Sequence, residues 1–165
     1  MRGRRVLLRP VRPEDIDRLR EILAEPSVAR WWGLPGVGDP TDDWLLGTDT
    51  VAFAIEVDGS VMGAIQYAEE TDPDYRHAGI DLFLATSYQG QGLGTDAIRT
   101  LARHLIEGRG HHRLTIDPAA DNERAIRAYA AVGFTPVGVM RAYERGPDGT
   151  FHDGLLMELL RGELR

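Results

Sequence analysis

Cysteine is absent from all 165 residues of the chain, which excludes disulfides, thiolate metal sites and a covalent intermediate on a cysteine. No apolar run approaches the ~20 residues that a transmembrane helix needs. The first residues include arginines but no apolar segment typical of a signal peptide. Lysine is missing too, so every basic side chain other than histidine is an arginine. We therefore expect one domain, residues 1–165, with one well-buried core, no leader and no membrane partner.

A glycine-rich segment is the most informative part of the chain. Residues Gln89 to Gly94 read Gln-Gly-Gln-Gly-Leu-Gly, and they lie between an alternating apolar run that ends at Leu84 and a segment of helical periodicity. The apolar residues of that segment share one helix face: Leu93, Ala97, Ile98, Leu101, Ala102, Leu105 and Ile106. Such a turn leaves backbone N–H groups unpaired at a helix N-terminus, where the helix dipole favours an anion. The segment predicts a phosphate or pyrophosphate site for a cofactor.

Two common nucleotide-binding motifs do not fit this segment. A P-loop needs Lys followed by Ser or Thr after its last glycine, whereas Thr95 and Asp96 follow Gly94. A dinucleotide fingerprint starting at Gly90 needs a small residue where Thr95 stands, and it belongs to a first βαβ unit rather than past mid-chain. The pattern that remains, Gln-x-x-Gly-x-Gly, resembles the acyl-CoA pyrophosphate loop of the GNAT acetyltransferases. A tight turn without a ligand is the alternative.

A second segment, residues 122–134, looks like the other GNAT hallmark of Asn, Ala, Tyr and Gly-Phe. Asp121 or Asn122 can cap a helix, and Gly133 can end it. Tyr129 follows Asn122 by seven residues, so both point along the same helix face. Without the resemblance, Asn122 would be only a cap and Tyr129 only a core aromatic. The resemblance implies acetyl-CoA as donor, bound by Phe83, Leu84, Ala85, Gln89, Gly90, Gln91, Gly92, Leu93, Gly94, Thr95, Asn122 and Tyr129.

The order of elements agrees with this family and predicts an α/β fold. Strands are expected at 5–9, 51–57, 61–68, 77–84, 112–117, 134–143 and 151–160, with a tight turn at 58–59. Helices are expected from 13, around 42–46, over 93–106 and from 122, with loops at 31–40 and 69–75. The resemblance implies a GNAT-like fold, a mixed twisted sheet with splayed central strands flanked by helices.

Acidic residues are concentrated in one part of a chain whose net charge is −7. Eleven lie between 39 and 81: Asp39, Asp42, Asp43, Asp49, Glu56, Asp58, Glu69, Glu70, Asp72, Asp74 and Asp81. Arg76 is the single base there, which leaves this part of the sequence at −10. Such a field attracts a cationic acceptor and argues against nucleic acid. A solvated acidic face that keeps the protein in solution is the alternative.

Two aspartates lie in or at the end of expected strands, where a carboxylate is costly without a partner or a role. Asp81 interrupts an apolar run, and Asp117 ends the next strand. These residues and their surroundings resemble the aminoglycoside 6′-N-acetyltransferases. The resemblance implies that Asp81 binds the acceptor amine and acts as base, while Asp117 binds the polycationic drug. Further acceptor contacts are expected from Trp31, Trp32, Tyr67, Glu69, Glu70, Asp72 and a late Asp-Gly, at either Asp153 or Asp148.

The chemistry that follows is transfer of an acetyl group to an amine. Without cysteine the transfer is direct, unless a serine or threonine takes part. Asp81 can accept the proton of the amine, backbone N–H groups near Leu84 and Ala85 can stabilise the oxyanion, and Tyr129 can serve the leaving thiolate. The histidines show no ligand spacing, so no metal is expected. We expect a monomer or homodimer in the cytoplasm, where free acetyl-CoA is found. A different amine (a protein N-terminus, a lysine or a siderophore intermediate) and a non-catalytic acyl-CoA- or drug-binding protein remain alternatives.

Overall fold

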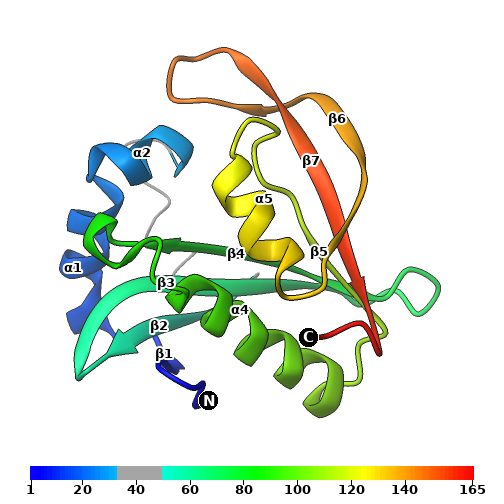
Figure 1. Cartoon of the computed structure of the whole chain (residues 1–165), viewed down its shortest axis with the longest axis horizontal. Helices are drawn as coiled ribbons and strands as arrows, with labels where there is room; N and C mark the ends of the chain where they lie inside the picture. The colour runs from blue at the N-terminus through cyan, green and yellow to red at the C-terminus, as the bar shows by residue number, and fades with distance from the viewer. Residues whose placement is uncertain (33–49) are drawn as a thin grey trace.

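The computed structural model describes residues 1–32 and 50–165, which form a mixed α/β structure (Figure 1). Seven strands form one sheet in the order β1-β2-β3-β4-β5-β7-β6. Neighbouring strands are antiparallel except for β4 and β5, which are parallel. The strands are β1 (Leu7–Pro10), β2 (Val51–Val57), β3 (Ser60–Glu70), β4 (His77–Leu84), β5 (Arg113–Ile116), β6 (Thr135–Arg145) and β7 (Phe151–Leu160).

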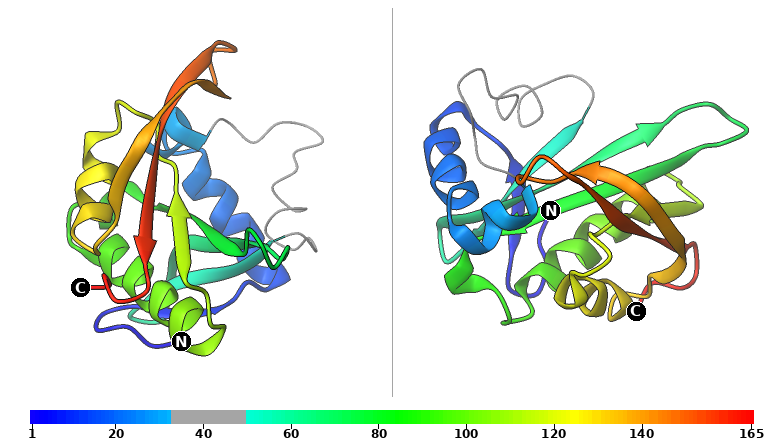
Figure 2. Two further views of the ribbon diagram at one scale, coloured as in Figure 1. Left: turned by 90° about the vertical axis from the view of Figure 1, so that its right-hand side faces the viewer. Right: turned by 90° about the horizontal axis from the view of Figure 1, so that it is seen from above.

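Helices cover both faces of this sheet (Figure 2). They are α1 (Ile16–Leu23), which follows the 3₁₀ turn η1 (Pro13–Asp15), then α2 (Pro26–Trp32), α4 (Leu93–Arg103) and α5 (Glu123–Ala130). A second 3₁₀ turn is η2 (Thr86–Tyr88), and α4 continues into a π-helical turn, η3 (His104–Gly108). In the described part of the chain, no helix is both long enough and apolar enough to span a bilayer.

Alternation along β4 divides its side chains between two layers. Ile80, Leu82 and Leu84 pack in the larger core with α4, all of whose expected apolar stripe is buried. Phe83 packs on the opposite face with the apolar stripe of α1. Because successive residues of a strand point to opposite faces, Asp81 lies on the same face as Phe83. The sheet therefore presents Asp81 next to the layer formed by α1 and α2.

The sheet opens between β4 and β5. These two parallel strands pair only at Ala78–Leu114 and Gly79–Thr115, and β4 then continues for five more residues without β5 beside it. The expected splay of the central strands is therefore present. It separates the second half of β4 from the end of β5, and it makes room for the cavity described below.

Most expected elements are present, and the differences are local. The turn between β2 and β3 has positive φ at both central residues, Asp58 (50°) and Gly59 (81°), as a tight hairpin requires. The prediction that a loop begins at residue 31 was wrong, because Trp31 and Trp32 form the last turn of α2. This helix was not predicted from the sequence. The remainder of that loop, the helix expected around 42–46 and the acids Asp39, Asp42, Asp43 and Asp49 lie outside the described residues.

Candidate active site

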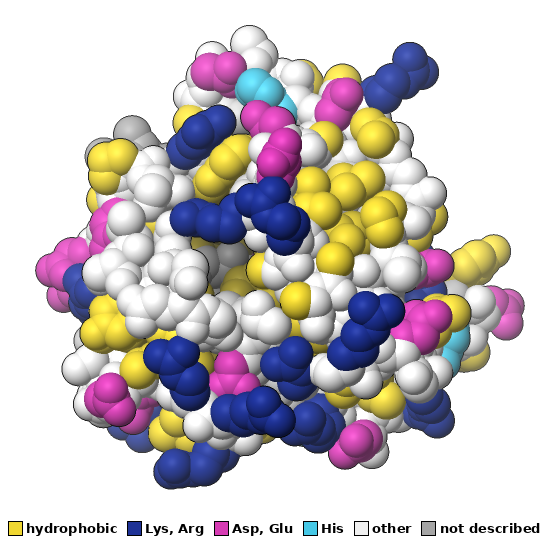
Figure 3. Space-filling model, in the orientation of Figure 1, with side chains coloured by type: hydrophobic (Ala, Val, Ile, Leu, Met, Phe, Trp, Pro, Cys, Tyr) yellow, Lys and Arg dark blue, Asp and Glu magenta, His cyan; other side chains and the backbone are white. Residues whose placement is uncertain are grey.

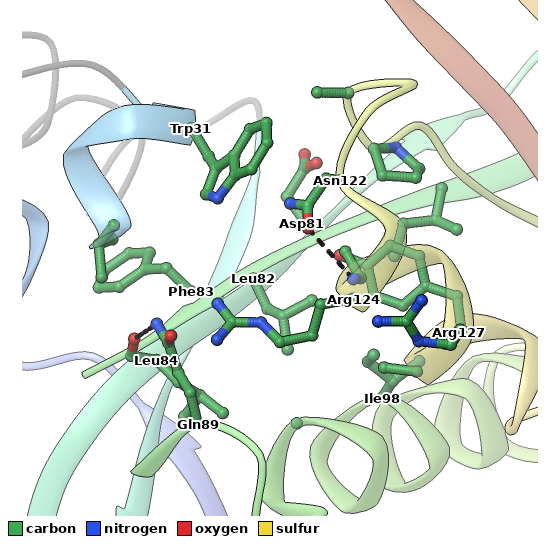
Figure 4. A pocket seen from close by; sticks show the side chains of 18 of the residues that line it. Trp31, Asp81, Leu82, Phe83, Leu84, Gln89, Ile98, Asn122, Arg124 and Arg127 are labelled. Carbon is green, nitrogen blue, oxygen red and sulfur yellow. Dashed lines mark hydrogen bonds between the residues drawn. The ribbon is translucent and has the colours of Figure 1, made fainter. Parts of the chain in front are cut away.

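A cavity of about 580 Å³ lies in the splay between β4 and β5. Its walls come from the end of α2, the second half of β4, the glycine-rich segment with the first turns of α4, the end of β5 and the inner face of α5 (Figure 4). Segments distant in the sequence thus meet here, including both GNAT-like motifs. Figure 3 shows arginine side chains beside the hollow on this face of the molecule.

The glycine-rich segment forms one wall with its backbone turned toward open space. Gly90 and Gly92 have φ of 74° and 78°, a conformation that L side chains rarely adopt, and a Cβ at either position would meet no described atom within 4 Å. Within the described residues, the N–H groups from Gly90 to Thr95 have no hydrogen-bond acceptor, since α4 begins at Leu93 and its first donors have no partner inside the helix. The segment is therefore suited to bind an anion, with unpaired donors and a helix dipole behind them.

The glycine-rich segment is held from two sides. Gln89 Nε2 donates to the carbonyl of Leu84 at 2.7 Å, which ties the start of the segment to the end of β4. Asp96, buried in the first turns of α4, accepts the backbone N–H groups of Arg4, Arg5 and Val6 at 3.1, 2.7 and 3.2 Å. These contacts fix the start of α4 against the segment that leads into β1.

Helix α5 forms the opposite wall. Asn122 caps it, because its Oδ1 accepts the N–H of Ala125 at 3.2 Å, and the same residue lines the cavity. Tyr129, near the other end of α5, also lines the cavity. Its pKa is raised by burial and further by the nearby charges of Asp81 and Asp117. The phenol is therefore neutral at physiological pH and can donate its proton to a hydrogen bond.

Two carboxylates lie at the other end of the cavity. The side chain of Asp81 is exposed to the cavity. The protein around it still desolvates the carboxylate, and this desolvation together with the charge of Asp117 raises its pKa to about 6. The side chain of Gln66, which lies opposite Asp81 across β3 and β4, partly opposes that rise. Asp117 accepts the phenol hydrogen of Tyr143 at 2.5 Å. An acid whose pKa is about 6 can accept a proton at neutral pH and release it again.

Other predicted residues also line the cavity. They are Trp31, Trp32, Phe83, Leu84, Gln89, Gly90, Gly92, Gly94 and Thr95. The structure thus brings together a donor side, at the glycine-rich segment, and an acidic end beside two tryptophans.

Three charged residues of this cavity were not predicted: Glu144, Arg124 and Arg127. The arginines lie in the segment 122–134, where the sequence assigned them no role, and their spacing of three residues on a helix was the available signal. Figure 4 shows Arg124 extending across the cavity toward Gln89 and Leu84. Glu144 carried no signal, because it stands in an exposed strand whose irregular pairing only the structure reveals.

The structure places four expected acceptor contacts, on β3 and in the turn that follows it, away from the cavity. Tyr67 is buried in the core, where its ring stacks with Phe53. Glu69 forms a bidentate pair with Arg109 at 3.0 and 2.6 Å and also contacts buried His111, so its charge is already satisfied. Glu70 is the last residue of β3, and its Oε1 accepts the N–H of Asp72 in the turn that follows. None of the four lines the cavity.

Asp153 and part of the expected donor set also make other contacts in the structure. Asp153 does not line the cavity, since its Oδ1 accepts the N–H of Ala142 within the β6–β7 hairpin. Ala85 is fully buried and its N–H donates to the carbonyl of Met62 at 2.8 Å, so it is not available for an oxyanion. The side chains of Gln91 and Leu93 point elsewhere, the first to the carbonyl of Ser87 and the second into the core, while their N–H groups stay unpaired in the described structure.

Comparison with known proteins agrees with the geometry. The family model for the acetyltransferase (GNAT) domain matches residues 5–135. The chain belongs to the GNAT acetyltransferases. Among curated relatives of this GNAT enzyme, the aminoglycoside N(6′)-acetyltransferase type 1 of Klebsiella pneumoniae is 32% identical over 164 residues, which covers 87% of this chain and 79% of the relative. The spermidine N(1)-acetyltransferase of Escherichia coli K12 is 26% identical over 139 residues, which covers 81% of this chain and 74% of the relative.

Solved structures place the fold in the same family. The aminoglycoside acetyltransferase AAC(6′)-Ib, in complex with coenzyme A and kanamycin, superimposes with a TM-score of 0.77 at 28% identity, over 94% of this chain and 95% of that one. The GNAT enzyme described here is accordingly an N-acetyltransferase with acetyl-CoA as donor. Its residues fit this donor: the unpaired N–H groups of residues 90–95 suit the pyrophosphate, and the open space over Gly90 and Gly92 permits its approach.

Proposed function

We propose that this GNAT enzyme acetylates a primary amine of a polycationic small molecule, the 6′-amine of aminoglycoside antibiotics. The observation that carries the proposal is the acidic end of the cavity, where Asp81 and Asp117 stand beside Trp31 and Trp32. Ammonium groups bind carboxylates through charge-assisted hydrogen bonds, and aromatic rings offer a surface to a sugar ring. The similarity to aminoglycoside acetyltransferases over most of the chain supports the same acceptor.

The residues of the chain have distinct roles in this proposal. Acetyl-CoA supplies a thioester carbonyl that an amine can attack. Asp81 binds the reacting ammonium and takes its proton, because a carboxylate with a pKa of about 6 is mostly ionised at pH 7.5. Asp117 binds a second ammonium group. Tyr129, kept neutral by its raised pKa, donates a hydrogen bond or its proton to the departing sulfur.

A linear polyamine is the second candidate acceptor. The spermidine acetyltransferase among the relatives favours it, since spermidine is also a polycation. A charge-assisted contact contributes roughly 1.5–3 kcal/mol, so the second contact, which a monoamine cannot make, selects a polycation by about ten- to a hundredfold. Both candidates meet this condition. A neutral peptide N-terminus does not.

The test is a thiol-release assay with acetyl-CoA and a panel of amines. Kinetic constants are compared for kanamycin or tobramycin, spermidine, lysine and N-terminal peptides. We expect the highest kcat/KM for the aminoglycosides, loss of most of the rate in Asp81→Asn, and mainly a raised acceptor KM in Asp117→Asn. Added salt should raise the acceptor KM, because exposed charges are screened. Equal turnover of peptides or monoamines would overturn the aminoglycoside proposal, and preference for spermidine would replace it with the second candidate.

A further inference from the structure

The β6–β7 hairpin departs from regular pairing at one place beside the cavity. Between the paired residues Met140 and Glu144, three residues of β6 lie opposite a single residue of β7, Asp153. The bulge is held in shape, because Asp153 Oδ1 accepts the N–H of Ala142 at 2.8 Å and Ala142 has a φ of 48°. Bulges re-aim the side chains that follow them. Here the residues re-aimed are Tyr143 and Glu144.

The bulge is joined to the strand end that carries Asp117. The N–H of Leu155 donates to the carbonyl of Pro118, and the N–H of Ala120 donates to the carbonyl of Asp153, both at 2.8 Å. The hairpin is thus connected by backbone hydrogen bonds to the loop after β5, at Pro118 and Ala120. The position of the hairpin relative to the acidic end of the cavity is therefore fixed.

Tyr143 uses this arrangement to hold Asp117. Its ring packs over Gly154, where a Cβ would lie only 2.8 Å from Tyr143 Cδ1. Its hydroxyl donates to Asp117 Oδ2 at 2.5 Å. One oxygen of Asp117 is therefore occupied and oriented, while Oδ1 has no partner in the described structure. Tyr143 is a positioning residue for the second acceptor carboxylate.

Glu144 brings a third carboxylate to the same end. It lines the cavity with Asp81 and Asp117, and its carboxylate makes no hydrogen bond or ion pair with any residue that the structure describes. Its pKa is raised by burial and by Asp117, although His152 opposes the rise. Glu144 in turn contributes to the raised pKa of Asp81, after burial and Asp117. Carboxylates that repel one another in a partly enclosed space are stabilised by cations that enter it.

The two arginines that line the cavity do not neutralise these carboxylates. Arg127 is paired with Glu123 on its own helix at 3.0 Å. Arg124 extends toward Gln89 and Leu84, on the donor side (Figure 4). The acidic end is thus left for the positive charges of a substrate.

We propose that Glu144 binds an ammonium group of the acceptor, separate from those at Asp81 and Asp117, so that the β6–β7 hairpin selects acceptors with at least three amino groups. This inference rests on the polycationic acceptor proposed above and adds a specificity-determining residue to it. The bulge and the Asp153 contact set the backbone position of Glu144, and the Tyr143 hydroxyl holds the carboxylate of Asp117.

The experiment compares Glu144→Gln with Glu107→Gln, which removes the same charge from an exposed site outside the cavity. The acceptors are kanamycin and an N-acylated kanamycin that keeps the 6′-amine and one other amine. Loss of one charge-assisted contact in a solvated cavity should lower kcat/KM for kanamycin about tenfold, through KM. The diamine should change less than twofold, and Glu107→Gln should match the wild type with both acceptors.

A second variant tests the positioning role. Tyr143→Phe keeps the ring over Gly154 but removes the donor to Asp117, so the KM for kanamycin should rise with kcat little changed. The double variant Tyr143→Phe/Asp117→Asn should be no worse than Asp117→Asn alone, since the hydroxyl acts only through that carboxylate.

Two results would overturn the inference about Glu144. One is equal loss with both acceptors in Glu144→Gln, which would make it a general field effect or a fold defect. The other is no loss with kanamycin. Failure of the proposed function is seen separately, in the wild type, as equal turnover of mono- and polyamines before any variant is compared.

Discussion

The raised pKa of Asp81 predicts the acidic side of the pH–rate profile. Burial and the charge of Asp117 hold the pKa at about 6 in the free enzyme. If the carboxylate must be ionised to bind and deprotonate the amine, kcat/KM should fall tenfold per pH unit below that value and level off above it. The perturbation that isolates the cause is Asp117→Asn, which removes a negative charge and keeps the shape of the side chain.

The size of the expected shift follows from the order of causes. Burial is the largest and persists in Asp117→Asn, so the pKa of Asp81 should not return to its ordinary 3.8. A neighbouring like charge raises a carboxyl pKa by about one unit at the low end of its usual effect. The acidic limb of kcat/KM should therefore move down by about one unit, while its plateau falls because acceptor binding is weaker.

The assay is thiol release at subsaturating kanamycin from pH 4.5 to 8.5, with wild type, Asp117→Asn and Asp81→Asn. In Asp81→Asn the limb near pH 6 should vanish along with most of the rate. The reasoning is refuted if the wild-type rate rises only with the pKa of the acceptor amine and Asp81→Asn shows the same profile. An unshifted limb in Asp117→Asn would refute the assigned role of that charge.

Three further expectations follow from the geometry. Gly92→Ala should raise the KM for acetyl-CoA about tenfold or more. Gly59→Ala is equally strained, at φ 81°, but lies on a distant hairpin, so it should leave this KM unchanged. Equal KM values in the two variants would contradict the pyrophosphate site. Tyr129→Phe should lower kcat about ten- to a hundredfold with little change in acceptor KM, and untouched turnover would make it a packing residue. Asp81→Asn should raise the melting temperature at pH 8, because an acid whose pKa is raised in the folded state lowers the stability once it is ionised. This gain in melting temperature should disappear below about pH 3.8, where the carboxyl is protonated in both the folded and the unfolded state. An equal gain at pH 3.5 and at pH 8 would contradict the reasoning.

Local patterns made part of the site predictable. The glycine-rich segment, its helix and the Asn122–Tyr129 helix are encoded by residues close in sequence, whose periodicity and turn chemistry can be read directly. Asp81 could be predicted for a similar reason, because a single acid within an apolar strand is conspicuous in the sequence. The edges of these elements shifted by only a few residues in the structure.

Side-chain partners distant in sequence were not predictable from the same patterns. Glu69 looked available because Arg109 and His111, which bind it, lie about forty residues later and meet it only through the pairing of the sheet. Glu144 faces the cavity because of a bulge, and a bulge changes the facing of a strand without changing its alternation in the sequence. Of the acids in the described residues 50–81, only Asp81 lines the cavity, so the charge summed over this part of the sequence did not locate the acidic end.

The contact between Asp96 and the segment leading into β1 has a consequence for how the family could vary here. Three donors reach one carboxylate, and all three belong to the main chain of Arg4, Arg5 and Val6. The position of the donor helix thus depends on one side chain, that of Asp96, and on main-chain donors at the other three positions. A comparison of diverged sequences should show a conserved acid at position 96 and varied, non-proline residues at the exposed positions 4 and 5, whereas position 6 should stay apolar because Val6 is buried in the core.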